Sequence, residues 1–375
     1  MREDPQRKGL LFAGTEQAVF VSFDDGDNWQ SLRNNMPATS IRDLVIKDDD
    51  LVVGTHGRSF WILDDITPLR QWTAQVAASE SHLFKPQLAT RVRRSNNTDT
   101  PIPPEEPMGQ NPPDGAIINY WLKADAQKVE LVILDVTDLL VRRYNSTDPP
   151  ESLDESRLAY PSYWFRPSRT LSTKAGLQRW TWDLRYAPPV GFGRAYGMQA
   201  LLRDTPAGPF GPLALPGDYT VLIVVNGNQT MRQPLKLRID PRVTTPAPDL
   251  ALQHTKARDC LEAIYKVRSL QAEVKQAREA LKAVADRAQA DAVDKQLAAL
   301  EGRTDGEDFF GGANREPGLS GIATGFFAVM NIIDAVDAAP TAQALAAVND
   351  LQARLDQASA QWKQLQPQAA QLKGK

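Results

Sequence analysis

The stretch from Ser22 to Trp29 constrains the fold of this chain more than any other. It reads S-F-D-D-G-D-N-W and directly follows the strand-like run Ala18-Val-Phe-Val21. Asp24 can accept hydrogen bonds from the backbone of its own turn, and Gly26 permits a positive φ. Trp29 is expected to fold back as an apolar plug for the next strand. The stretch therefore predicts a hairpin corner between β-strands, a structural feature that carries no chemistry of its own.

This corner resembles the Asp-box, or bacterial neuraminidase repeat, which recurs in the β-propeller blades of sialidases and sortilin-type receptors. Asn28 stands where that family usually has Thr or Ser. The run V-V-G-T-H-G-R-S-F-W-I-L-D-D, residues 52–65, resembles the closing blade of sortilin-like bacterial proteins of the glycosyl hydrolase kind. The resemblance implies structural Asp-box roles for four residues: Ser22, Asp24, Gly26 and Trp29.

Residues 1–75 are accordingly expected to be one or two terminal propeller blades. Short alternating runs and turn residues over 9–70 also predict strands. A propeller needs about four to eight blades to cover its sheet faces and edges. We therefore expect these residues to be the end of an array whose other blades lie outside this chain.

The expected fold class is multidomain β plus α, with three further parts after the blades. Residues 76–114 are rich in Pro, Asn and Thr and predict a linker or strap, which Ser81 to Phe84 would open as an edge strand. Residues 115–243 hold about seven short strand patterns, which suggest an immunoglobulin-like β-sandwich. Their L-P-G-D-Y-T-V run resembles the immunoglobulin-like domain of flagellar-hook capping proteins. Residues 249–375 are expected to form a helical hairpin or bundle.

One apolar stripe from Cys260 to Ala288, at spacings of three and four, predicts a single long helix that ends near Gly302. A second helical block is expected from Leu319 to Val336, and a third after the cap Thr341. The sequence leaves open whether this helical tail pairs within the chain or self-associates. The glycine- and proline-rich insertion from Ala187 to Leu215 is too long for a turn and is expected to pack structurally, with a binding surface as the alternative.

The composition limits the classes of partner that this chain is expected to bind. The net charge of −3 offers no basic field for nucleic acid. The single cysteine, Cys260, excludes an intrachain disulfide, and no cofactor or metal site is expected. Asp48, Asp49 and Asp50 are expected at a solvated hairpin tip. No segment predicts a membrane span, and no signal peptide is visible, although the resemblance implies a secreted or periplasmic full-length protein.

Four residues are candidates for ligand contact. His56 and Arg58 lie in G-T-H-G-R, where flanking glycines let a ligand approach the backbone closely. Asp64 and Asp65 end the same run, and capping or turn bonding competes with a catalytic role for them. The alternative is a tight turn in which Arg58 pairs with Asp64 or Asp65. No catalytic residue of the sialidases can be carried over, because no matching motif is present.

Two functions follow from these patterns. The first is a non-catalytic binding or scaffold portion of an exported sortilin-like propeller protein, which would engage a protein, peptide or glycan. The second is the accessory C-terminal part of a glycoside hydrolase whose catalytic carboxylates lie in blades outside this chain.

Overall fold

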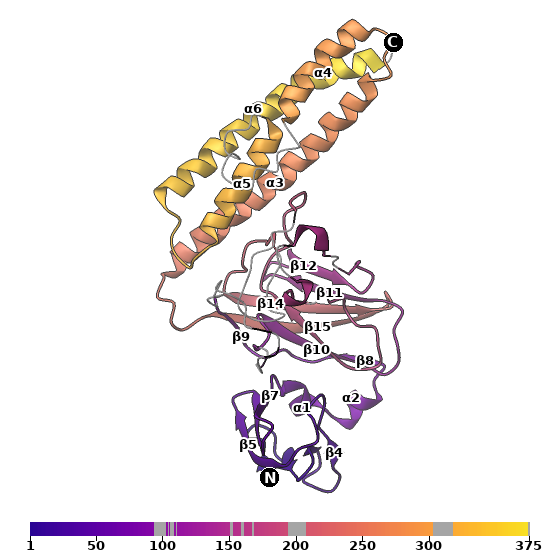
Figure 1. The fold of residues 1–375 in the computed structure, drawn as a ribbon, viewed down its shortest axis with the longest axis vertical. Helices are drawn as coiled ribbons and strands as arrows, with labels where there is room; N and C mark the ends of the chain where they lie inside the picture. The colour runs from indigo at the N-terminus through magenta and orange to yellow at the C-terminus, as the bar shows by residue number, and fades with distance from the viewer. Residues whose placement is uncertain are drawn as a thin grey trace. The chain divides into compact units, whose positions relative to one another are not determined.

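The computed structural model describes residues 1–93, 103, 105, 109, 111–150, 153–158, 161–166, 169–193, 208–302 and 318–373. It has several β-sheets and a C-terminal helical region, which confirms the mixed β plus α class (Figure 1). Residue contacts divide the chain into two compact units. The first holds residues 1–184 and 216–240, and the second holds 185–193, 208–215 and 241–373 among the described residues.

The first unit begins with two small antiparallel sheets. One sheet contains strands β1 (Arg2–Glu3), β2 (Leu11–Gly14), β3 (Val19–Ser22) and β4 (Gln30–Ser31) in sequence order. The other contains β5 (Ile41–Lys47), β6 (Asp50–Thr55) and β7 (Phe60–Leu63). These strands fall where alternating apolar residues and intervening turns predict them, within one or two residues at each end.

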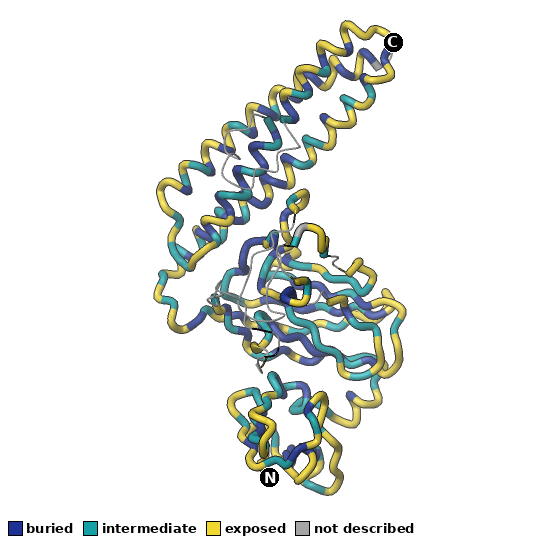
Figure 2. The backbone as a smooth tube through the Cα atoms, in the orientation of Figure 1, coloured by how far each residue is buried: buried dark blue, intermediate teal, exposed yellow. Residues whose placement is uncertain are grey.

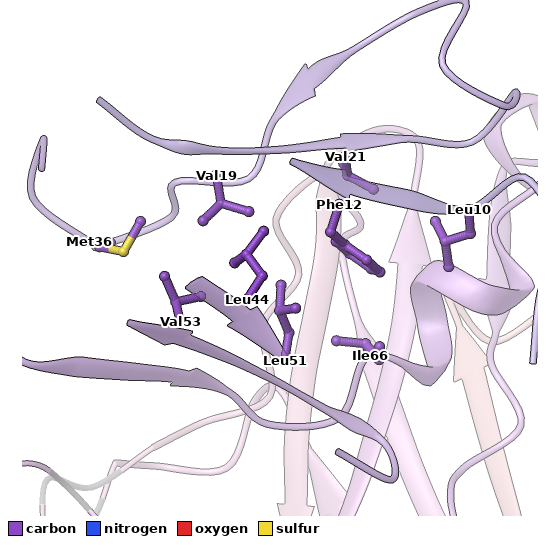
Figure 3. Packing of buried hydrophobic residues seen from close by; sticks show 9 residues of the cluster. All are labelled: Leu10, Phe12, Val19, Val21, Met36, Leu44, Leu51, Val53 and Ile66. Atoms are coloured by element: carbon purple, nitrogen blue, oxygen red, sulfur yellow. The ribbon is translucent and has the colours of Figure 1, made fainter. Parts of the chain in front are cut away.

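The two sheets pack face to face over a shared apolar core (Figure 3). Phe12 and Val21 pair across β2 and β3, and Leu44 and Val53 pair across β5 and β6, so each sheet contributes cross-strand rows. Since side chains alternate along a strand, each of these rows occupies the inner face of its sheet. The remaining buried members of the cluster are Leu10, Val19, Met36, Leu51 and Ile66.

A buried ion pair ties the first residues of the chain to helix α1 (Thr67–Gln71). Arg70 Nε donates to Asp4 Oδ2 at 2.9 Å, and its Nη1 donates to Asp49 Oδ1. The Asp4 side chain is fully covered and that of Arg70 is 8% exposed. Such a pair is costly to break, because the partner left behind is a buried charge.

The rest of the first unit contains helix α2 (Ala74–Ala78) and two larger sheets. The three-stranded sheet has the order β13 (Gly176–Trp182), β10 (Ala116–Leu122) and β8 (Ser81–Leu83). The five-stranded sheet has the order β12 (Leu140–Asn145), β11 (Val129–Leu134), β14 (Gly217–Val225), β15 (Gln229–Ile239) and β9 (Ala89–Arg91). Two 3-10 turns, η1 (Glu155–Arg157) and η2 (Ser162–Trp164), lie between β12 and β13.

These two sheets share a core, since Trp182 of β13 contacts Tyr219 of β14 edge to face at 5.3 Å. Strand β8 is the edge strand expected near Ser81. Strand β9 lies inside the predicted linker and pairs parallel to β15 through Leu237 and Ala89. No pattern in the sequence predicts β9, because three residues are too few to show a period.

Among the described residues of the second unit, four helices form a bundle: α3 (Ala247–Leu281), α4 (Arg287–Glu301), α5 (Leu319–Ile333) and α6 (Ala342–Lys373). Figure 2 shows their buried residues as stripes along each helix. The prediction of one helix through Ala288 is wrong. Helix α3 ends at Leu281, and Asp286 begins α4 by accepting a bond from Gln289 N. Apolar spacing alone missed this break because Val284 in the turn is also buried.

Helix α5 is apolar around most of its surface, as expected of a helix enclosed on several sides. It contacts α3 and α6, and a β-carbon at Gly325 would lie 2.6 Å from Leu351 of α6. The described parts of the long insertion, 185–193 and 208–215, cover it further. Phe192 stacks on Phe327 with ring centres 4.2 Å apart, and Arg185 pairs with Asp334 at 2.7 Å. Within the predicted insertion from Ala187 to Leu215, residues 187–193 and 208–215 are described, and Phe192 packs against a helix there; residues 194–207 lie outside the described residues.

Candidate functional site

An exposed apolar sheet surface lies on β5, β6 and β7. One cross-strand row joins Val45, Val52 and Ile62, and a second joins Asp43, Gly54 and Phe60. These six residues are the β5–β7 outer face. Phe60 is 76% exposed, Ile62 56% and Val45 47%. An apolar face of this kind usually marks an interaction site.

The hairpin between β6 and β7 holds His56 and Arg58 at one end of this face. Gly57 has φ 74° and Ser59 has φ 65°, so the turn depends on left-handed backbone at two positions. The Arg58 amide donates to Thr55 Oγ1 at 3.1 Å, and its carbonyl accepts from Trp61 Nε1 at 2.9 Å. Both His56 and Arg58 are exposed, and the hairpin fixes their backbone beside Phe60.

Asp65 lies at the opposite end of β7 in a buried polar network. Its carboxylate accepts from Thr67 N at 3.1 Å, from Thr67 Oγ1 at 2.5 Å and from Asn119 Nδ2 at 2.7 Å. Arg179 donates to Asn119 Oδ1 and to the Asp65 carbonyl, each at 3.0 Å. This network joins the end of β7 to the outer face of the three-stranded sheet, and it leaves Asp65 2% exposed.

Burial raises the pKa of the Asp65 carboxyl, although the Thr67 and Asn119 bonds and the Arg179 charge act the other way. Burial likewise lowers the pKa of the Arg179 guanidinium. Both pKa shifts arise because these two side chains are buried where the end of β7 packs against the three-stranded sheet. Asp65 thus occupies a capping and joining position, and its carboxylate is not presented to a ligand.

The structure does not bring the four candidate residues together. Arg58 precedes β7 and Asp64 follows it, so about 20 Å of extended chain separates them at about 3.3 Å per residue. The alternative pairing of Arg58 with Asp65 is wrong, because the Asp65 carboxylate is bonded to Thr67 and Asn119. His56 and Arg58 remain as one cluster, and Asp64 and Asp65 lie apart from it.

Opposite charges mark the two ends of the β5–β7 outer face. One end carries the exposed Arg42, His56 and Arg58, together with the Arg2–Asp43 ion pair, whose charges cancel. The other end has four carboxylates at or near its surface, Asp48, Asp49, Asp50 and Asp64. With the covered Asp4 and Asp65 there are six carboxylates against four cations, Arg7, Lys47, Arg70 and Arg179, a formal balance of two negative charges.

The three consecutive aspartates each have a structural partner. Asp48 pairs with Lys47 at 3.1 Å, Asp49 pairs with Arg70, and Asp50 accepts from Asp65 N at 2.9 Å. Among the residues that the structure describes, no group of three His, Cys, Asp or Glu side chains could hold a metal ion. Burial raises the pKa of the Cys260 thiol to about 12, which is unfavourable for thiolate chemistry.

The Asp-box stretch forms a closed hydrogen-bonded corner. Ser22 Oγ donates to Asp24 Oδ1 at 2.8 Å and accepts from Gly26 N at 2.9 Å. Asn28 Nδ2 donates to Asp24 Oδ2 at 2.7 Å, so the asparagine amide supplies a side-chain donor to the carboxylate. Trp29 lies close to Gly26 and is 37% exposed, so the expected apolar plug is only partly buried.

Replacing Asp24 with asparagine is expected to remove part of the acid sensitivity of this corner. The bonds from Asn28 and Ser22 lower the pKa of Asp24. A lowered pKa stabilises the fold above the unfolded-state value and loses that effect as pH falls through the folded-state value. The melting-temperature difference between wild type and Asp24→Asn should therefore be larger at about pH 7 than at about pH 3. An equal difference at both pH values would contradict this.

Sequence reasoning missed three residues of these networks: Asp4, Asn119 and Arg179. Each lies far along the chain from its partner, so no local spacing connects them. Arg70 had a weak signal, since a cation in the last turn of a short helix is favourable.

Comparisons of the chain with protein-family models, with curated proteins and with solved structures gave no match. Across the described residues, no helix is both long and apolar enough to cross a membrane.

Proposed function

We propose that this chain is the non-catalytic binding and scaffold portion of an exported, sortilin-like Asp-box propeller protein. One observation carries the proposal: the β5–β7 outer face displays Phe60, Ile62 and Val45 to solvent beside the exposed polar hairpin of His56 and Arg58. Interaction surfaces combine such apolar side chains with polar groups at the rim. The partner class that this face suits is protein.

The bonding of two candidate carboxylates, Asp24 and Asp65, favours a binding role over hydrolysis. A glycosidase needs two carboxyl groups about 5–10 Å apart that both face the substrate. Asp24 holds its own corner, and Asp65 is covered by Thr67 and Asn119. These hydrogen bonds favour a structural role for both the Asp24 and the Asp65 carboxylate.

The finer fold assignments belong to the same proposal. We take the two N-terminal sheets as propeller blades, because the Asp-box hydrogen bonds close the corner between β3 and β4. We take the three- and five-stranded sheets as an immunoglobulin-like sandwich, because they share the core around Trp182 and Tyr219. Secretion or a periplasmic location follows from the resemblance alone.

The test combines an activity assay with a binding assay. The chain should not hydrolyse sialyl or β-glucan reporter substrates above the buffer rate. It should bind members of a peptide and protein array, and Phe60→Asp should remove those signals, because a charge on the face opposes apolar contact. Val136→Asp is the matched control, since Val136 is 79% exposed and lies on the β11–β12 turn.

If the chain hydrolyses a reporter substrate and Asp64→Asn abolishes that hydrolysis, the non-catalytic role is wrong. Array signals that persist unchanged in Phe60→Asp would overturn the assignment of the face.

A further inference from the structure

We propose that the β5–β7 outer face binds the same face of a second copy of this chain, with the strands of the two copies antiparallel. The inference rests on the proposed function in taking this face as the binding surface, and it adds the identity of the partner. It follows from the residue pattern of the strands, the packing already present on the inner face and the charges at the two ends.

The strands of this sheet have the pattern of a sheet covered on both sides. Residues 44–46, 51–53 and 60–63 are continuous apolar runs, where a sheet with one solvated face usually alternates apolar and polar residues. The inner-face members Leu44, Leu51 and Val53 are buried under the β1–β4 sheet. The outer-face members Val45, Phe60 and Ile62 belong to the same runs and have no cover among the described residues.

A second β-sheet is the partner whose shape this face fits. Sheets pack face to face about 10 Å apart with strands within about 30° of alignment, and the inner side of β5–β7 is already packed against a sheet. The middle row, Val45, Val52 and Ile62, is entirely aliphatic, so a copy of itself meets no like charge there. A second copy thus supplies the layer that a further blade would supply in a longer propeller.

The charges select the antiparallel arrangement. A parallel pair would bring Arg58 near the partner's Arg58, and would bring the four carboxylates together. In an antiparallel pair, the end with Arg42, His56 and Arg58 lies over the end with Asp48, Asp49 and Asp64. Complementary charges of this kind fix the register of an interface. The resulting pair has two-fold symmetry and is closed, so it does not grow into a filament.

Sedimentation equilibrium of the full chain from about 1 to about 100 µM tests the pairing, a range that brackets micromolar affinity. The wild type should convert reversibly from monomer to dimer. Ile62→Asp and Phe60→Asp should each raise the dissociation constant at least about 100-fold, because each places a charge among the apolar contacts. Val136→Asp should dimerise like the wild type.

A charge exchange tests the orientation. The two-fold axis places β5 over the partner's β5, so Arg42 at its start lies over the partner's Asp48 after its end. Arg42→Glu alone and Asp48→Lys alone should each weaken the dimer about tenfold, because each changes two end contacts per pair. Combined in one chain, the two changes should restore most of the affinity, since Glu then faces Lys at both ends. Higher salt should weaken the wild-type dimer, and melting temperatures of all variants verify that they are folded.

A chain that stays monomeric at the highest concentration overturns the inference, as does a dimer that Ile62→Asp and Phe60→Asp leave intact. A dimer whose single charge variants are not rescued in combination overturns the antiparallel arrangement. None of these results depends on hydrolysis of the reporter substrates. Absence of the dimer therefore leaves the non-catalytic proposal standing, and hydrolysis of a reporter leaves the dimer proposal standing.

Discussion

Arg70→Met is expected to lower the free energy of unfolding of the first unit by about 3–5 kcal/mol, the usual cost of breaking a buried ion pair. The Asp4 side chain is fully covered, and Arg70 is the cation that it contacts, at 2.9 Å. Methionine fills much of the arginine volume, so the loss reports the missing charge and hydrogen bonds. Gln6 N and Arg7 N still donate to Asp4, and the charge of the Arg7 guanidinium still acts on it, so the loss should lie toward the lower end of this range.

Urea unfolding with hydrogen exchange read by mass spectrometry checks this result. Protection should fall in residues 2–14 and 41–71, which the ion pair connects, while residues 250–300 should keep theirs. Lys174→Met is the matched control, because Lys174 and Asp125 form an exposed pair whose side chains are 77% and 56% accessible. That control should change stability by less than about 1 kcal/mol. A similarly small effect for Arg70→Met would mean that Asp4 is not held as a buried anion.

Asp65→Asn is expected to cost about 2–3 kcal/mol at neutral pH, since it removes an acceptor from a buried donor. Asparagine tolerates the left-handed φ of 58° at this position, so the backbone contributes little to the loss. Its amide would place a donor against Asn119 Nδ2, which now donates to the Asp65 carboxylate. The Thr67 bonds to the other oxygen can persist, which limits the effect to the joint with β10.

The exchange variant Asp65→Asn with Asn119→Asp makes the test specific. Donor and acceptor then trade places, and the carboxylate at 119 also receives the bond from Arg179 Nε. Chemical unfolding should therefore show recovery of most of the loss in the double variant. Purely additive losses would show that the two side chains do not interact.

The pH dependence of the same variant has a definite sign. Burial raises the pKa of Asp65, so its titration stabilises the fold at low pH and loses that effect as pH rises through the folded-state value. Asp65→Asn lacks this titration. The stability gap between wild type and variant should therefore narrow as pH increases across the acidic range, and a gap that widens would contradict the assignment.

Local patterns predicted the small sheets and the helices well, because alternation and turn residues act over a few positions. The strands from Ile41 to Leu63 follow the predicted order, and their register places Val52 opposite both Val45 and Ile62. The end of α3 was missed because the turn from Lys282 to Asp286 continues the apolar spacing with Val284.

The candidate site could be predicted only in part. G-T-H-G-R correctly suggested an exposed hairpin, but the sequence could not show that β7 separates Arg58 from Asp64 and Asp65. The partners of Asp65 lie 54 and 114 residues away, at Asn119 and Arg179. Long-range contacts of this kind depend on how whole sheets pack, and no spacing in one sequence encodes them.

The described segments between β13 and β14 pack on α5. This contact matters for any experiment that expresses the sheets and the helices as separate fragments. A cut near residue 243 would part Phe192 and Arg185 from Phe327 and Asp334, although each pair lies within one compact unit. The helical fragment would expose Phe327, and the sheet fragment would expose Phe192 on a loop without its packing partner. Recombination between homologous genes at that point should yield insoluble products, whereas exchange of the whole chain should not.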